Sequence, residues 1–208
     1  MALIAICPGG DWASERAADW CAQALQELGA SPGLVLEKDT ATHGDLCQGL
    51  ARHPGADAWY FGHGGPAAWF ACQEQNGYLH LHRYILEEPQ ADILKGVAVL
   101  AVACESALQL GPSSISKGAV AYVGFERSVA WAPIISQTEK AVGACIVAIA
   151  KEFARTPRGQ AATSLSHILA VAQEHYDYWV ELRDEGDVTA ASVVGYIDLI
   201  RTGLRVFP

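Results

Sequence analysis

Short apolar runs alternate with amphipathic segments between residues 2 and 123, and this alternation constrains the fold more than any other feature of the sequence. Runs rich in β-branched and aromatic residues are typical of buried strands. We expect strands at 2–7, 34–37, 58–61, from 99 to the turn at 104, and 119–123. Helical spacing of apolar residues predicts helices at about 14–28 and 42–52. Strands and helices that alternate in this way predict a mainly parallel sheet with right-handed crossovers and helices on both faces.

Two other parts of the chain have a different pattern. Between residues 66 and 95, an Asn76-Gly77 turn signal before an alternating segment at 78–82 predicts a small hairpin insert followed by a short helix. The region 134–208 is predicted to be helical, with a short edge strand at 204–207. A polar loop is expected at 112–114. We interpret the whole chain, 1–208, as one domain.

Composition limits the function classes that the chain can serve. The chain has 208 residues, of which 51% are hydrophobic and 18% charged, so it can bury one substantial core. A net charge of −9 without clustered Lys and Arg argues against a nucleic-acid partner. The N-terminal residues do not resemble a secretory signal and no apolar run reaches the length of a membrane span, so we expect a cytoplasmic protein without membrane contact.

The cysteines and histidines do not follow the spacing of a metal site. The six cysteines are scattered, with no Cys-x-x-Cys pair, which suits a reducing compartment. His80 and His82 alternate on one face of a predicted strand, yet the sequence offers no third ligand. We therefore expect no metal and no cofactor.

Two predicted strands end at residues that could perform chemistry together. One strand is followed by Gly62-His63-Gly64, and another ends at Ala103-Cys104. Ligands of open parallel sheets bind beyond the carboxyl ends of the strands, so His63 and Cys104 could share one crevice. A thiol attacks a carbonyl as its thiolate, and a neighbouring His favours that form. The backbone amides of Gly64 and Cys104 are candidate donors to a developing oxyanion.

The motifs around these residues resemble those of a known group. An apolar strand that ends in His-Gly is followed 41 residues later by an apolar strand that ends in Ala-Cys, and then by a Gly-Ala-x-Ala-Tyr-Val-Gly strand at 118–124. This pattern is similar to that of the caspase-like cysteine peptidases, which include caspases, metacaspases, legumain, gingipains, separase and bacterial CHAT domains. The nucleophile motif at 103–106 is most similar to that of legumain, whereas 118–124 and the following helices look more like CHAT proteins. The resemblance covers roughly residues 2–176.

The resemblance implies a three-layer α/β/α caspase-like sandwich and a cysteine endopeptidase. His63 would be the general acid and base, Cys104 the nucleophile, and the amides of Gly64 and Cys104 the oxyanion donors. The substrate would be a protein or peptide, and bacterial relatives suggest an activating partner protein. Many relatives carry a Gly two or three residues after the nucleophile, whereas this chain has Ser106-Ala107.

The same resemblance suggests which residues form the pocket for the residue before the scissile bond. It indicates Asp11, Glu105 and Glu126. Trp131 lies in a loop that we expect to face the site, where it could form a wall of the pocket. Acidic groups there would favour a basic substrate residue through charge-assisted hydrogen bonds. Arg127 could instead neutralise Glu126 or select an acidic residue.

Two other functions fit the same residues. One is a catalytically inactive relative that binds peptides in the same groove. The other is a different cysteine-dependent α/β hydrolase of the DJ-1 or PfpI type, which Pro8-Gly9-Gly10 and the Ala-Cys turn suggest. This alternative is weaker because Pro8-Gly9-Gly10 does not follow the strand that it follows in DJ-1. The Gly-x-Cys-x-Gly elbow of glutamine amidotransferases and the Gly-x-Ser-x-Gly motif of serine hydrolases are both absent.

Overall fold

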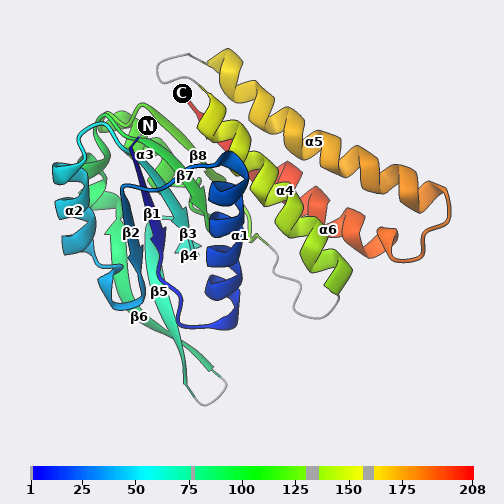
Figure 1. Cartoon of the computed structure of the whole chain (residues 1–208), viewed down its shortest axis with the longest axis horizontal. Helices are drawn as coiled ribbons and strands as arrows, with labels where there is room; N and C mark the ends of the chain where they lie inside the picture. The colour runs from blue at the N-terminus through cyan, green and yellow to red at the C-terminus, as the bar shows by residue number, and fades with distance from the viewer. Residues whose placement is uncertain (1, 76–77, 130–135, 157–161) are drawn as a thin grey trace.

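A six-stranded sheet forms the centre of the molecule (Figure 1). The computed structural model describes residues 2–75, 78–129, 136–156 and 162–208. The strand order is β2-β1-β3-β7-β8-β9, and all neighbours are parallel except β9, which pairs antiparallel with β8. The strands are β1 (Leu3–Cys7), β2 (Leu34–Glu37), β3 (Asp57–Phe61), β7 (Ala98–Val102), β8 (Ala121–Phe125) and β9 (Leu204–Phe207). The predicted α/β fold with a mainly parallel sheet is confirmed.

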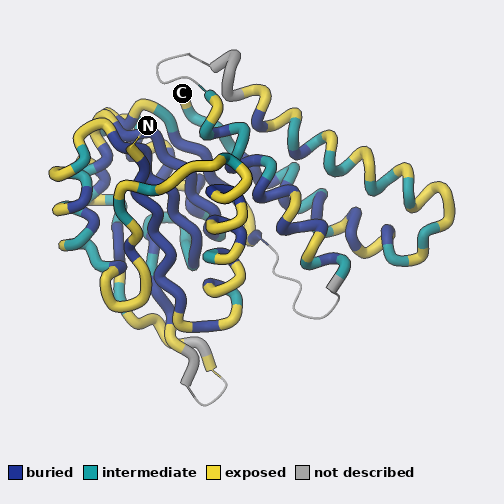
Figure 2. The backbone as a smooth tube through the Cα atoms, in the orientation of Figure 1, coloured by how far each residue is buried: buried dark blue, intermediate teal, exposed yellow. Residues whose placement is uncertain are grey.

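Alternate strand residues serve two hydrophobic cores on the opposite faces of the sheet. In β1, Leu3 and Ala5 belong to one core and Ile4 and Ile6 to the other, as the two-residue period of a strand requires. Figure 2 shows the central strands as buried, while the outer sides of the helices are exposed. Helices therefore cover both faces of the sheet.

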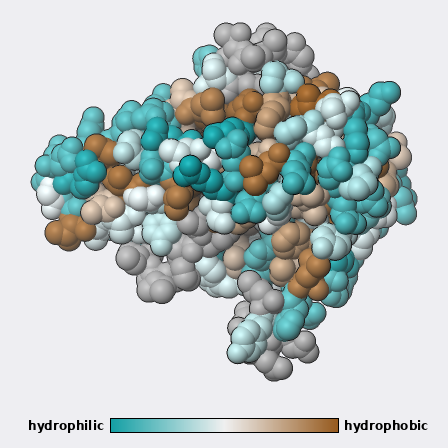
Figure 3. All heavy atoms as spheres, turned by 180° about the vertical axis from the view of Figure 1, so that it is seen from behind, coloured by the Kyte–Doolittle hydropathy of each residue, from teal (hydrophilic) through white to brown (hydrophobic). Residues whose placement is uncertain are grey.

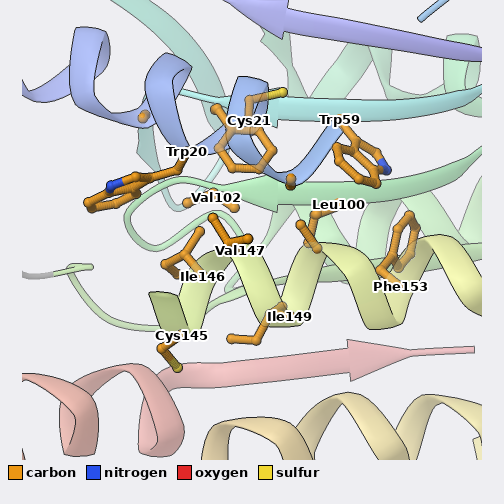
Figure 4. Packing of buried hydrophobic residues seen from close by; sticks show 14 of the residues in the cluster. Trp20, Cys21, Trp59, Leu100, Val102, Cys145, Ile146, Val147, Ile149 and Phe153 are labelled. Carbon is orange, nitrogen blue, oxygen red and sulfur yellow. The ribbon is translucent and has the colours of Figure 1, made fainter. Parts of the chain in front are cut away.

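The first core is closed by two long helices. These are α1 (Trp12–Leu28) and α4 (Ser136–Arg155). Figure 4 shows Trp20 of α1 and Ile146 of α4 near Val102 of the sheet, in the core to which all three belong. The opposite core is closed by α2 (His43–Arg52), α3 (Leu110–Ser116) and the 3₁₀ helix η2 (Glu88–Leu94), together with part of a second sheet.

The second sheet is a small antiparallel one that follows β3 directly. It contains β4 (His63–Gly65), β5 (Ala68–Gln75) and β6 (Tyr78–Glu87) in that order. The hairpin of β5 and β6 extends away from the body of the molecule (Figure 1). The hairpin and short helix predicted within 66–95 are confirmed, although the strands are longer than the sequence pattern indicated.

The C-terminal region is helical and ends in an edge strand, as predicted. After α4 come α5 (Ala162–Asp184) and α6 (Ala190–Gly203), and β9 then joins the edge of the main sheet. Figure 1 shows α5 as the outermost of the three helices. The sequence predicts that Pro157 and Gly159 separate the first two of these helices, and both residues lie outside the described part of the chain. Viewed from behind, apolar side chains lie in small groups among hydrophilic ones (Figure 3).

Two local predictions are wrong, namely the loop at 112–114 and the strand start at residue 119. The segment 112–114 is part of α3. Pro112 is tolerated because it lies in the first turn, where backbone N–H groups have no helical acceptor. The Ser114 hydroxyl donates to the Leu110 carbonyl at 2.6 Å. The following strand begins at Ala121 because the Ala119 amide still bonds to the Ser114 carbonyl at the end of the helix.

Candidate active site

The candidate site lies where three neighbouring strands end. β1, β3 and β7 are adjacent, and Phe61 is paired in register with Val102. His63 and Cys104 each follow this pair by two residues, so the parallel register carries both to the same edge of the sheet. Asp11 follows the end of β1, the strand on the other side of β3. His63 therefore comes from the middle of three strand ends, with Asp11 and Cys104 coming from the two that flank it.

Asp11 binds His63 directly. The side chain of Asp11 is only 2% exposed, and its Oδ2 lies 2.8 Å from Nε2 of His63. The same carboxylate caps α1, because Oδ1 accepts hydrogen bonds from the amides of Ala13 and Ser14, and Oδ2 accepts one from the Ser14 hydroxyl. A carboxylate can only accept, so Nε2 of His63 carries the proton of this bond. In the neutral ring, Nδ1 is then the nitrogen that can accept a proton.

The surroundings of Asp11 keep its carboxylate ionised. Burial alone would raise the pKa of Asp11, but the hydrogen bonds from His63 and Ser14 outweigh it and leave the pKa below its ordinary value. The hydrogen bond from Nε2 to this buried carboxylate orients the ring of His63.

Glycines allow the turn after β1 to reach His63. Gly10 has a positive φ of 104°, and a Cβ at this position would lie 2.4 Å from the carbonyl oxygen of Cys72 in β5. A side chain cannot be accommodated so close to backbone, so glycine permits the turn to lie against the hairpin. Asp11 follows at once and is thereby brought across the edge of the sheet.

Residues of β3 and β5 hold the backbone and the ring of His63 in place. The buried Tyr60 hydroxyl lies 2.6 Å from the His63 carbonyl and 2.9 Å from the Phe70 carbonyl, both of which can accept its proton. The rings of His63 and Phe70 are stacked, with 6.2 Å between their centroids and 6° between their planes. Backbone and ring are thus both held by neighbours on β3 and β5.

Cys104 lies on a sharp turn pinned to the end of β8. Its thiol is half-buried, and Sγ donates a long hydrogen bond of 3.9 Å to the Val129 carbonyl. The next residue, Glu105, has a φ of 54°, which is uncommon for a residue with a side chain. The Glu105 amide donates to the Arg127 carbonyl at 3.2 Å. Side-chain-bearing residues held in this conformation are concentrated at functional sites.

The side chain of Ser106 helps to form the turn after Cys104. Its buried hydroxyl lies 3.1 Å from the Ala103 carbonyl, to which it donates. A Cβ at Gly124 would lie 2.8 Å from this hydroxyl oxygen. The serine is therefore accommodated by a glycine on the neighbouring strand β8, and its side chain closes the turn from inside.

Gly64 brings the two strand ends into contact. A Cβ at Gly64 would lie 2.7 Å from the Cβ of Ala103 and 2.8 Å from the carbonyl oxygen of Cys104. Contacts this short do not occur between real side chains and backbone, so this approach requires glycine. The segments that carry His63 and Cys104 therefore touch at Gly64.

The structure describes three of the four residues that were predicted to form the substrate pocket. The prediction that Asp11 lines the substrate pocket needs correction, because its carboxylate is bound to His63 and to the first turn of α1. Glu126 is half-buried in an ion pair with Arg205 of β9 at 2.6 Å, so its charge is balanced by a residue that we did not consider. Glu105 is half-buried on the turn itself, and Trp131 lies outside the described residues.

A second Cys–His pair, on α2, was missed by the sequence analysis. Nδ1 of His43 lies 3.1 Å from the Ile85 carbonyl and must donate to it, which leaves Nε2 to accept from Cys47 Sγ at 3.5 Å. Burial, and then the charge of Asp92, raises the pKa of the Cys47 thiol. The spacing of four residues on a predicted helix is the signal that could have found this pair.

Among the residues that the structure describes, no group of three or more His, Cys, Asp or Glu side chains could hold a metal ion. No helix in the described part of the chain is both long and apolar enough to cross a bilayer. Comparison of the sequence with models of known families and with curated proteins gives no match.

Proposed function

We propose that the protein is a cysteine endopeptidase of the caspase-like type, with Cys104 as the nucleophile and His63 as the general acid and base. The observation that carries the proposal is the hydrogen bond between buried Asp11 and Nε2 of His63, at a strand end in register with that of Cys104. A nucleophile, a base and a group that orients the base are the three elements of nucleophilic catalysis.

The fold supports the same proposal. A mostly parallel six-stranded sheet with helices on both faces carries the His after β3 and the Cys after the adjacent strand β7. This is the order that the resemblance to caspase-like peptidases implies, and it favours a three-layer caspase-like sandwich.

The chemistry follows from the atoms at the site. Nδ1 of His63 takes the thiol proton, and the thiolate of Cys104 attacks the carbonyl carbon of the scissile bond. The amides of Gly64 and Cys104 stabilise the oxyanion. His63 then protonates the leaving amine, the C–N bond breaks and a thioester remains on Cys104. Water, deprotonated by His63, hydrolyses the thioester and regenerates the thiol.

A preference for a basic residue before the scissile bond now rests on Glu105 alone. Asp11 and Glu126 are engaged by His63 and Arg205. Glu105 is half-buried beside the nucleophile, where a substrate Lys or Arg could form a charge-assisted hydrogen bond with its carboxylate.

The contact of Cys104 with Val129 favours a second candidate function. A thiol that donates to a backbone carbonyl is stabilised in its protonated, less nucleophilic form. A peptide-binding module that does not cleave would tolerate this arrangement.

The test uses fluorogenic peptides that vary in the residue before the scissile bond. Wild type is compared with Cys104→Ala and His63→Ala, and with Cys47→Ala and His43→Ala as matched controls from the second pair. The proposal predicts hydrolysis that is lost in the first two variants and kept in the controls. Hydrolysis that persists in Cys104→Ala contradicts it, and peptide binding without hydrolysis by wild type would favour the binding module.

A further inference from the structure

The side of the site that receives the leaving group is marked by an apolar surface on the hairpin. In a cysteine peptidase the general acid protonates the leaving amine, so the substrate residue that carries this amine lies beside the acid. Here the acid is His63, and the ring stacked on it belongs to Phe70 of β5. The surroundings of Phe70 therefore indicate which residues are accepted after the scissile bond.

Aromatic rings form a row across the three strands of the second sheet. His63 pairs with Phe70 between β4 and β5, and Phe70 pairs with Tyr84 between β5 and β6. The rings of Phe70 and Tyr84 meet edge to face at 6.2 Å, and Tyr84 is 47% exposed. We call His63, Phe70 and Tyr84 the aromatic row. It leads from the catalytic ring to the exposed part of the hairpin.

A bulge extends the apolar surface beyond the row. Phe70 pairs with Tyr84, and Cys72 pairs with Leu81. The two residues of β5 are two positions apart, whereas the two residues of β6 are three positions apart. The additional residue in β6 places Leu81 on the same face as Tyr84, because paired residues share a face of the sheet. Leu81 is 50% exposed.

Glycine keeps the approach to this surface open. A Cβ at Gly65 would lie 3.6 Å from Cε1 of Phe70, so a longer side chain at this position would lie against the ring that a substrate must reach. An extended peptide can therefore approach the ring of Phe70 over Gly65 without meeting a side chain at that position.

We propose that the aromatic row binds the side chain of the residue immediately after the scissile bond, and that the enzyme prefers an aromatic or large aliphatic residue there. The inference rests on the proposed peptidase function. Partial burial of such a side chain against Phe70 and Tyr84 is expected to raise kcat/KM about tenfold over glycine.

The experiment uses a set of peptides that differ only in the residue after the scissile bond, built on a sequence that wild type cleaves. Phe and Leu are expected to exceed Gly about tenfold in kcat/KM. Tyr84→Ala should reduce this ratio to about twofold. Tyr78→Ala is the matched control, since Tyr78 is a 72% exposed aromatic residue of the same strand that lies three residues from Leu81, on the opposite face; it should leave the ratio unchanged.

The outcomes separate the two proposals. Equal cleavage of the Phe and Gly peptides by wild type, or a preference that Tyr84→Ala leaves intact, overturns the inference while the peptidase function stands. If wild type cleaves no peptide in either series, the proposed function fails and the inference fails with it.

Discussion

Two Cys–His pairs in the described part of the chain differ in where the fold places them and in what surrounds each histidine. Cys47 and His43 are one turn apart on α2, with 3.5 Å between Sγ and Nε2. Cys104 and His63 follow two adjacent parallel strands, on segments that touch at Gly64. The two pairs therefore differ in how the fold holds the thiol and the imidazole.

The third group distinguishes the two pairs. His43 donates to a neutral backbone carbonyl, whereas His63 donates to a buried carboxylate whose pKa is lowered. Only the carboxylate stabilises the imidazolium that nucleophilic catalysis requires. The pKa of Cys47 is raised by burial and by Asp92, which works against a thiolate on the helix.

The largest difference between the two pairs is expected when each histidine is removed. We expect His63→Ala to lower kcat/KM for peptide hydrolysis by about 10³-fold or more, because the variant loses both the base and the acid. His43→Ala should retain activity within about twofold, because His43 lies on α2 and contacts Cys47 and β6 rather than Cys104. Steady-state assays of both variants measure this difference. An equal loss of kcat/KM in both variants would contradict the assignment of His63 as the acid and base.

The role of the carboxylate is tested by Asp11→Asn. Asparagine is as good a helix N-cap as aspartate, so α1 is expected to persist. The amide cannot stabilise the imidazolium, so kcat should fall about 100-fold or more while KM changes little. An unchanged kcat would mean that Asp11 only caps the helix.

Close contact between the strand ends is tested by Gly64→Ala. The new Cβ would lie 2.7 Å from the Cβ of Ala103, and the resulting shift should reduce kcat/KM about tenfold and destabilise the fold by about 1–3 kcal/mol. Gly195→Ala in α6 is the matched control, because its Cβ meets nothing within 4 Å. A helical alanine there should be neutral or stabilising by up to about 1 kcal/mol. Denaturant unfolding and assays of both variants provide the measurement.

The smallest expected effect is on acid stability. The pKa of Asp11 is lowered in the folded state, so the carboxylate contributes stability above its unfolded pKa of about 4 and loses it as the pH falls through the lower, folded value. The difference in unfolding free energy between wild type and Asp11→Asn should therefore be largest near pH 7 and shrink below about pH 4. Urea unfolding at several pH values checks this, and a difference that grows in acid would contradict it.

Periodicity and strand ends made much of this arrangement predictable. β2 was predicted at 34–37, where it lies, and the ends of β3 and β7 identified His63 and Cys104 as neighbours. These features are local in sequence, since two-residue and helical periods are visible in short windows. The register of adjacent parallel strands then follows from the fold class.

The contacts that were missed join residues far apart in the chain. Asp11 reaches His63 across 52 residues through a turn that depends on Gly10 lying against Cys72. Glu126 is paired with Arg205 because β9 returns to the sheet beside β8. A single sequence does not show which surface charges such returns bring together. The sequence consequently assigned Asp11 to a substrate pocket rather than to His63.

The most direct test of the account is to find which thiol reacts with a substrate-like electrophile. Wild type would be treated with one equivalent of a peptidyl acyloxymethyl ketone, and the adduct located by peptide mapping and mass spectrometry. The account predicts a single adduct on Cys104, abolished in His63→Ala and unaffected in His43→Ala. An adduct on Cys47, or labelling of Cys104 that does not depend on His63, would contradict the claim that the strand-end pair is the reactive one.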